Sequence, residues 1–289
     1  MIRLALVLTL VPGLAAAHSG EAPGWPGPEP WLAIPMLLAG GLYLFGFRRL
    51  RARSDHGRSE LTRRGGLFAL AWLTLAGAAL SPLHALGARS FTAHMVEHEL
   101  IMLAAAPLFV WSRPLGALLW AFPAAARKGL AAVARSRAGS GAWRVLTDPL
   151  LATVVQAAAI WIWHVPSLFD LALRSEAWHL AQHATFFASA LLFWSAMLGP
   201  GRNAWTTAAC LFATSMVTGA LGAVMAFSES PWYGPYAALG LAAFGLTPAE
   251  DQQLAGILMW VPGGLFHAMV ALALLIPHLS DPRGKARHG

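Results

Sequence analysis

Charged residues are scarce in this sequence. Lysine, arginine, aspartate and glutamate together make up 11% of the 289 residues, while 57% of the residues are hydrophobic. A soluble domain usually carries about 25% charged residues, because most of its surface faces water. The low share argues against a soluble domain, so we expect most of the surface of this chain to face a lipid bilayer.

Cysteine is almost absent, and acidic residues are fewer than basic ones. Cys210 is the single cysteine, so the chain forms no internal disulfide and holds no metal site built from several thiolates. The net charge is +7, which in a soluble protein suggests nucleic-acid binding. Here the basic residues fall in short loops between apolar runs, so they indicate membrane topology, and no nucleic-acid partner is expected.

Residues 1–17 have the pattern of a secretory signal peptide. Arg3 precedes a short apolar core at 4–14, and three alanines at 15–17 form a small-residue cleavage site. An uncleaved first anchor is the alternative, but the core is short for a membrane span. We predict cleavage, which leaves an irregular outer segment, rich in proline and glycine, at 18–30.

Seven apolar runs of spanning length follow the outer segment. A helix needs about 20 apolar residues to cross the hydrocarbon core, and lipid offers no partner for backbone N–H and C=O groups, so each span must be a helix. The sequence thus predicts an all-α membrane protein with a seven-helix transmembrane bundle at 31–277. The predicted spans are 31–47, 65–83, 93–111, 148–164, 177–198, 204–227 and 253–277.

The loops between the runs predict the orientation. Most lysines and arginines fall after the first, third, fifth and seventh runs, whereas Arg89 and Arg174 are the basic residues of the opposite loops. Basic residues accumulate on the cytoplasmic side, so the N-terminus is predicted outside and the basic tail at 278–289 in the cytoplasm. The longest outer loop, at 228–252, carries Tyr236 among other aromatic residues whose rings are expected at the membrane interface.

Two histidine pairs lie at the outer ends of predicted spans. His94 and His98 open the third span, and His179 and His183 open the fifth. A separation of four residues puts both imidazoles of a pair on one helix face, one turn apart. Neutral imidazole is the commonest metal ligand near neutral pH, and ionisable groups inside a membrane are costly. The pairs therefore predict a metal site at the water-facing mouth of the bundle.

Further candidate residues lie on other predicted spans or beside the pairs. His164 closes the fourth span at the same depth, and His267 lies deeper in the seventh. His84 ends the second span and is interpreted as a helix-packing residue, because single polar residues commonly join helices. Glu97 and Glu99 flank the second histidine of the first pair. One of them is a candidate to orient a ligand imidazole, and an acid facing the headgroups is the alternative.

The residue types around the pairs bear on which metal binds. Imidazole suits copper, zinc and iron, whereas the thioether of Met102, four residues beyond His98, favours Cu(I). Most of the methionines are interpreted as core filler. Residues 94–98 also read H-x-x-E-H, the inverted zinc-protease motif. That motif is short and matches by chance, and the pair at 179–183 lacks a glutamate, so no proteolysis is predicted.

Several blocks of residues, in order along the chain, resemble a known family. The blocks are HMVEH at 94–98, APL at 106–108, RPL at 113–115, WHVP at 163–166, the pair at 179–183, and MWVPG at 259–263 after Asp251 and Gln252. They cover about 93–267. The resemblance is to the multi-span CtaG family of cytochrome c oxidase assembly factors, in the caa-type group.

The resemblance implies a non-enzymatic, multi-pass protein of a bacterial-type inner (plasma) membrane that helps to mature a haem–copper oxidase. Its implied cargo is copper, as Cu(I), taken from an outer-side copper donor and passed to an oxidase subunit. Single-span copper chaperones that share the CtaG name use cysteine ligands, which this chain lacks. Glu99 departs from the family pattern, because an apolar residue is expected there. The ligands implied by position are His94, His98, His164, His179, His183 and His267.

Two other functions are compatible with the histidines. A haem- or metal-containing membrane oxidoreductase would hold its cofactor between histidines on facing helices. A copper transporter would need polar or thioether residues that continue through the bundle, and His267 and Gln156 are the deep candidates. Both functions stand as alternatives to copper delivery in oxidase assembly.

Overall fold

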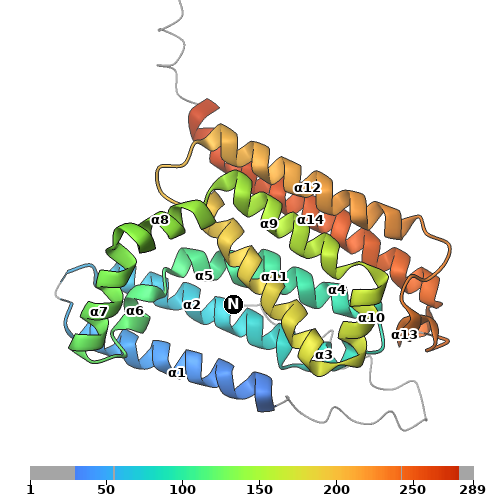
Figure 1. Cartoon of the computed structure of the whole chain (residues 1–289), viewed down its shortest axis with the longest axis horizontal. Helices are drawn as coiled ribbons and strands as arrows, with labels where there is room; N and C mark the ends of the chain where they lie inside the picture. Colours follow the sequence, from blue (N-terminus) through green and yellow to red (C-terminus); the bar gives the residue numbers. More distant parts are fainter. Residues whose placement is uncertain (1–29, 55, 242, 280–289) are drawn as a thin grey trace, which may run out of the picture.

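The computed structural model describes residues 30–54, 56–241 and 243–279, and all secondary structure in these residues is helical (Figure 1). The all-α prediction is confirmed. The predicted signal peptide, outer segment and basic tail lie almost entirely outside the described residues.

Each of the seven apolar runs coincides with a long helical segment. Local capping sets where several of them begin: the side chains of Ser90, Asp148 and Asn203 accept hydrogen bonds from backbone N–H groups two or three residues further on. The segments are α1 (Pro30–Ala52), α2 (Arg58–Ala79), the continuous α4–η2–α5 (Phe91–Glu99, Leu100–Ala105 and Ala106–Ser112), α9 (Pro149–Trp163), α11 (Glu176–Met197), α12 (Ala204–Ala226) and α14 (Pro248–Leu279).

Fewer than seven of these segments are long and apolar enough to cross a membrane by length and composition alone. Four segments of the described residues qualify: Arg58–Gly87, Phe91–Ser112, Ala204–Ala226 and Pro248–Leu279. A fifth is added if α8 (Arg137–Leu146) and α9, which are bent by 61° at their junction, count as one span. The protein thus has four or five candidate spans, and the predicted count of seven and the predicted orientation stay predictions.

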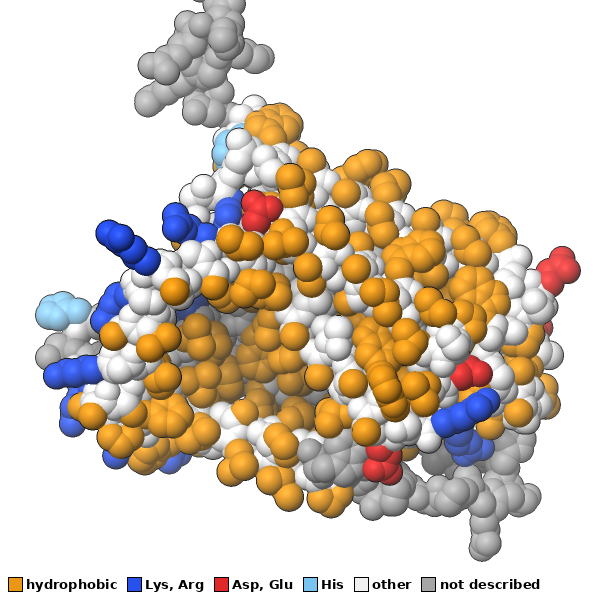
Figure 2. All heavy atoms as spheres, in the orientation of Figure 1, with side chains coloured by type: hydrophobic (Ala, Val, Ile, Leu, Met, Phe, Trp, Pro, Cys, Tyr) orange, Lys and Arg blue, Asp and Glu red, His pale blue; other side chains and the backbone are white. Residues whose placement is uncertain are grey.

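The other helices are short and lie toward the two ends of the bundle (Figure 1). One end carries α6 (Leu115–Leu119), α7 (Ala124–Arg135) and α8, and the opposite end carries α3 (Pro82–Gly87), α10 (Pro166–Arg174) and α13 (Gly234–Ala237). Most lysine and arginine side chains visible in Figure 2 lie at the α6–α8 end. That end is the one predicted to be cytoplasmic, and the α3–α10–α13 end is the one predicted to lie outside.

Apolar side chains cover the flanks of the bundle (Figure 2). Leu38 on α1, Phe212 on α12 and Leu265 on α14 are all more than half exposed. Soluble monomers rarely expose apolar patches of more than a few hundred Å². The surface therefore suits a lipid environment, as the scarcity of charge predicts.

A π-helical turn interrupts the third predicted span. The N–H of Ala106 bonds to Ile101 O, five residues back, so it does not reach Met102 O as in an α-helix. Pro107 has no N–H to offer that carbonyl either. The indole N–H of Trp194, on α11, donates to Met102 O at 2.8 Å and satisfies it. Turns of π-helix are rare overall, but many of those that occur lie at functional sites. This segment is therefore considered again in the description of the site.

Helices α12 and α14 pack closely, because small residues face each other. A Cβ at Gly222 would lie 2.6 Å from the carbonyl oxygen of Gly256, so neither position has space for a side chain. The two helices run side by side along the bundle (Figure 1). This packing fixes α14, whose residues meet the start of α4 and line the cavity described below.

The start of α14 also caps the start of α4. The buried carboxylate of Asp251 accepts hydrogen bonds from Ser90 Oγ at 2.9 Å and from the backbone N–H of Phe91 at 2.6 Å. The hydroxyl of Thr92 donates to Asp251 O at 2.8 Å. These bonds satisfy polar groups of the first turn that have no partner within their own helix. They hold the segment that carries His94 one turn later.

Candidate metal site

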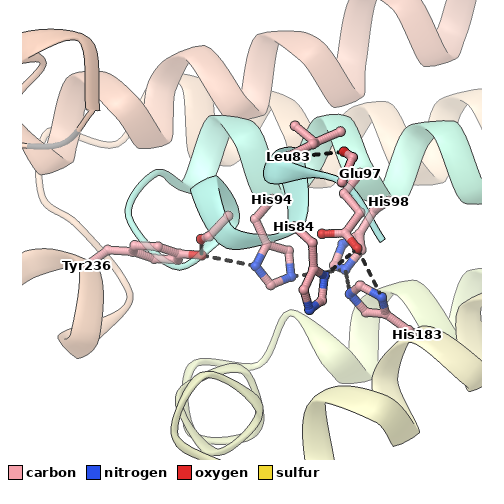
Figure 3. Close-up of polar contacts among 9 residues, drawn as sticks. Leu83, His84, His94, Glu97, His98, His183 and Tyr236 are labelled. Atoms are coloured by element: carbon pink, nitrogen blue, oxygen red, sulfur yellow. Dashed lines mark hydrogen bonds and ion pairs between the residues drawn. The ribbon is translucent and has the colours of Figure 1, made fainter. Parts of the chain in front are cut away.

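Histidines from three helices meet at the α3–α10–α13 end of the bundle. His84 comes from α3, His94 and His98 from α4, and His179 and His183 from the first turns of α11. Figure 3 shows the imidazoles of His84, His94, His98 and His183 gathered together. The turn between α3 and α4 brings His84 back beside the first pair. We call these five residues the histidine cluster.

Imidazole nitrogens lie close to one another within the histidine cluster. His94 Nε2 lies 3.0 Å from His98 Nε2, which lies 3.2 Å from His183 Nε2. Two imidazole nitrogens bound to one tetrahedral ion, with bonds of about 2.0–2.1 Å, lie about 3.3 Å apart. Ligand nitrogens of His94, His179 and His183 also lie within 4.8 Å of one another. The spacing fits ligands that share an ion.

Tyr236 fixes the tautomer of His94. Its hydroxyl donates to the carbonyl oxygen of Gly87 at 2.6 Å, so it accepts from His94 Nδ1, which lies 3.0 Å away. Burial raises the pKa of Tyr236 well above the ordinary value, and Asp251 and Glu97 raise it further, so the phenol keeps its proton. The proton of His94 therefore sits on Nδ1, and the Nε2 lone pair faces the cluster.

Glu97 has the same effect on the other side of the histidine cluster. Its buried carboxylate oxygen Oε1 lies 2.8 Å from His84 Nδ1 and 3.4 Å from His183 Nδ1. A carboxylate behind a ligand imidazole orients the ring and leaves Nε2 free to bind a metal. Of the two acids that flank His98, Glu97 is thus the one that contacts imidazoles of the cluster.

Imidazole lone pairs that face one another within the histidine cluster favour a bound cation. If His94 and His183 carry their protons on Nδ1, both present lone pairs to His98 Nε2. His98 Nε2 carries at most one hydrogen, so it can donate to only one of these two nitrogens. A cation between the three nitrogens relieves the remaining lone-pair contact. The cluster is therefore suited to a metal ion.

The six ligands predicted by position do not all lie together. His94, His98, His179 and His183 belong to the histidine cluster. His164 lies beside it: its Nδ1 donates to Ile160 O at 2.7 Å, its ring lies 6.2 Å from that of Phe186, and the Phe186 ring lies 4.8 Å from that of His98. Hydrogen bonds among the described residues do not join His164 to another imidazole.

His267 lies apart from the histidine cluster. Its ring stacks on Trp194 at 5.7 Å, with an angle of 13° between the ring planes, and it also contacts Phe193 at 5.9 Å. Its Nδ1 donates to Gly263 O, one turn earlier in α14, at 2.7 Å. His267 thus lies apart from the outer pairs, and its role as a metal ligand, which the resemblance implies, stays a prediction.

Two residues of the site were not identified from the sequence. His84 was interpreted as a helix-packing residue, yet its ring stacks on that of His179 at 5.1 Å and its Nδ1 meets Glu97. Tyr236 was expected at the membrane interface, whereas it is buried and contacts His94. The repeated presence of His at the same predicted depth was a signal for His84, but no spacing pattern pointed to Tyr236.

One comparison with known proteins identifies the family of the chain. A family model described as cytochrome c oxidase caa3 assembly factor (Caa3_CtaG) matches residues 41–280. No curated protein matches the chain, and no solved structure does. The match covers most of the chain, including every helix that carries a histidine of the cluster, and it confirms the resemblance seen in the sequence. The chain belongs to the cytochrome c oxidase caa3 assembly factor family.

Proposed function

We propose that this cytochrome c oxidase assembly factor supports oxidase maturation by binding copper at the histidine cluster and passing it to an oxidase subunit. Family membership supports the role in assembly. The observation that carries the copper proposal is the grouping of ligand nitrogens of His94, His179 and His183 within 4.8 Å of one another. His98 Nε2 lies beside this group, 3.0 and 3.2 Å from the Nε2 atoms of His94 and His183. Copper is here a cargo, accepted from an outer-side donor and released to the oxidase.

The donor set suits a cargo that must bind and leave again. Neutral imidazole binds copper, and Cu(I) accepts few ligands in varied geometry, so a histidine cluster offers several equivalent positions. The side chain of His84 retains 15% of its exposure, while those of His94 and His98 are buried. His84 thus forms the open edge at which a donor or acceptor would exchange the ion.

The membrane arrangement is part of the same proposal. Seven spans, with the N-terminus outside and the C-terminus in the cytoplasm, place the histidine cluster at the outer mouth of the bundle. Support comes from the coincidence of all seven apolar runs with helices, and from the basic side chains at the α6–α8 end. A bacterial-type inner membrane is the location that this topology and the family imply.

The haem alternative meets a steric difficulty. A haem held between two histidines has its porphyrin plane between their Nε2 atoms. His94 Nε2 and His98 Nε2 are 3.0 Å apart and belong to adjacent turns of one helix, so a porphyrin does not fit between them. The geometry therefore supports a single bound ion over a bis-histidine haem at this cluster.

Metal analysis of matched variants tests the copper proposal. Protein purified from copper-replete membranes is expected to contain copper, and replacing His94 and His98 together by Ala is expected to remove most of the copper that the cluster holds and to lower oxidase activity in the cells. His278→Ala is the control, because His278 is exposed on the last turn of α14. Unchanged copper content and unchanged oxidase activity in the double variant would overturn the proposal.

A further inference from the structure

A second polar region lies deeper in the bundle than the histidine cluster. A cavity of about 20 Å³, room for about one water-sized occupant, lies between the α4–η2 segment and helices α9, α11, α12 and α14. Among its lining residues are two thioethers, a carboxylate, an amide, a hydroxyl and an imidazole. These are Met102, Met259, Glu99, Gln156, Thr214 and His267.

A carboxylate and an imidazole meet at one turn of α14. A Cβ built on Gly263 would lie 3.4 Å from Glu99 Oε2, so the carboxylate rests against this glycine. The carbonyl oxygen of the same glycine accepts the proton of His267 Nδ1 at 2.7 Å. That bond fixes the tautomer and leaves Nε2 of His267 as the nitrogen with a lone pair. Both groups belong to the lining of the cavity.

Polar atoms of the cavity are buried without a hydrogen-bond partner. Glu99 Oε2 and Gln156 Oε1 have none among the described residues. The Gln156 side chain is buried, and its Nε2 points to the sulfur of Met102 at 3.5 Å. Leaving such groups unpaired costs free energy, and an acid inside a membrane is usually paired and functional. An occupant that accepts the lone pairs of these oxygen atoms would therefore stabilise the cavity.

The sulfur atoms indicate what kind of occupant fits. Met102 and Met259 are both buried and come from facing segments, η2 and α14. Thioether sulfur is a soft ligand that selects Cu(I), and imidazole binds the same ion. The carboxylate of Glu99 would balance the single positive charge. Magnesium and calcium are usually bound by oxygen ligands alone, whereas this lining also presents two sulfur atoms and an imidazole nitrogen.

We propose that this cavity is a second binding site for monovalent copper, with Met102, Met259 and His267 as ligands and Glu99 as the balancing charge. One helical segment links it to the histidine cluster, because Met102 follows His98 by one turn, ~6 Å along the helix axis. The π-helical turn lies at this link, and Trp194 holds it through Met102 O while stacking on His267. The inference rests on the proposed function for the delivery of copper to the bundle, but its ligand set is separate.

X-ray absorption of the full-length protein, loaded with Cu(I) under reducing conditions, tests the site. The spectrum is expected to contain copper–sulfur scattering beside the copper–nitrogen scattering of the histidine cluster. The double variant Met102→Leu, Met259→Leu is expected to lose the sulfur scattering and about half of the bound copper. Leu conserves the volume of Met and keeps the packing. Absence of sulfur scattering from the unmodified protein, or its persistence in the double variant, overturns the proposal.

Matched controls separate this inference from the proposed function. Met216→Leu with Met269→Leu is the control, because both side chains are more than half exposed on α12 and α14. It is expected to leave the spectrum unchanged. His94→Ala with His98→Ala is expected to reduce the nitrogen scattering to the share that His267 contributes, while the sulfur scattering remains. Sulfur scattering together with a copper content that is unchanged in the His94/His98 variant would refute the histidine cluster as a copper site but retain the cavity. Nitrogen scattering without sulfur scattering would do the reverse.

A gentler variant covers the case in which the methionine changes disturb folding. Glu99→Gln keeps the shape of the side chain and removes its charge. It is expected to weaken the sulfur-containing site ~10-fold, measured by competition with a Cu(I) chelator, because the charge of the ion is no longer balanced. An unchanged affinity of that site would contradict the role assigned to Glu99 and, with it, the proposed ligand set.

Discussion

The hydroxyl of Tyr236 lies 3.0 Å from Nδ1 of His94, although 142 residues separate them in the sequence. The same hydroxyl donates to Gly87 O, so three segments of the chain meet at one oxygen atom. This contact orients the imidazole that opens the histidine cluster. In the proposed copper site Tyr236 is thus a positioning residue, which would act on the ion through His94.

Replacing Tyr236 by Phe tests this role. The ring keeps its packing against Phe91, but His94 Nδ1 loses its acceptor, so the imidazole is free to change tautomer. We expect the Cu(I) affinity of the purified protein to fall ~10-fold in a chelator competition. Tyr43→Phe is the control, because Tyr43 is also buried but stacks on Phe68 away from the cluster. Equal affinities of the two variants would rule out the positioning role.

Glu97→Gln tests the carboxylate behind His84 and His183. The amide has the shape of the carboxylate but carries no charge, so it holds the two Nδ1–H groups less firmly. We expect a ~10- to 100-fold loss of Cu(I) affinity with little change in the helical content measured by circular dichroism. Glu176→Gln, an exposed position in the first turn of α11, should leave the affinity unchanged. A variant of Glu97 that binds as the parent does would show that this carboxylate does not orient the ligands.

Local patterns allowed much of the fold and half of the site to be predicted. The apolar runs give the seven long helices, because burial in lipid depends on composition over about 20 consecutive residues. The pairs at His94 and His98 and at His179 and His183 follow from the helical repeat alone. The contact between Tyr236 and His94 cannot be predicted from local patterns, because it depends on how a distant loop folds over the end of the bundle.

A level shared by α4 and α14 accounts for the separation of His267 from the histidine cluster. Asp251 meets the first turn of α4, so it marks a common level of α4 and α14. His267 lies about 24 Å further along α14, whereas His98 lies about 10 Å beyond Phe91. Counted from that shared level, the rise of each helix places His267 deeper in the bundle than the histidine cluster. The shared level itself follows from the contact of Asp251 with α4, which the sequence does not show.

Asp251→Ala is expected to lower the stability of the α4 segment. The change leaves Ser90 Oγ and the N–H of Phe91 buried without their acceptor, which we expect to cost about 3 kcal/mol of the free energy of unfolding. Denaturant unfolding in detergent, followed by circular dichroism, measures the difference. Asp148→Ala is the comparison, because Asp148 caps its own helix at an exposed site and should cost about 1 kcal/mol. Equal losses would show that Asp251 acts only as a local cap.

The shortest of the seven long helical segments is α9, and its place in the proposed topology is open to a direct test. Its 15 residues span about 22 Å, less than the ~30 Å hydrocarbon core, and it qualifies as a span only together with α8. Ser136 precedes it and Ser167 follows it, both exposed, while the native Cys210 is buried. A thiol introduced at either serine is therefore the main accessible thiol in the described part of the chain.

In cells with a permeabilised outer membrane, a membrane-impermeant maleimide should label Ser167→Cys at once and Ser136→Cys only after the inner membrane is disrupted. The unmodified protein is the control for labelling of Cys210, which should be low. Labelling of both variants from outside, or of neither, would show that α9 does not cross the membrane. Because the histidine cluster lies at the end of the bundle that carries α10, the side on which Ser167 reacts is also the side from which the proposed copper donor would reach the cluster.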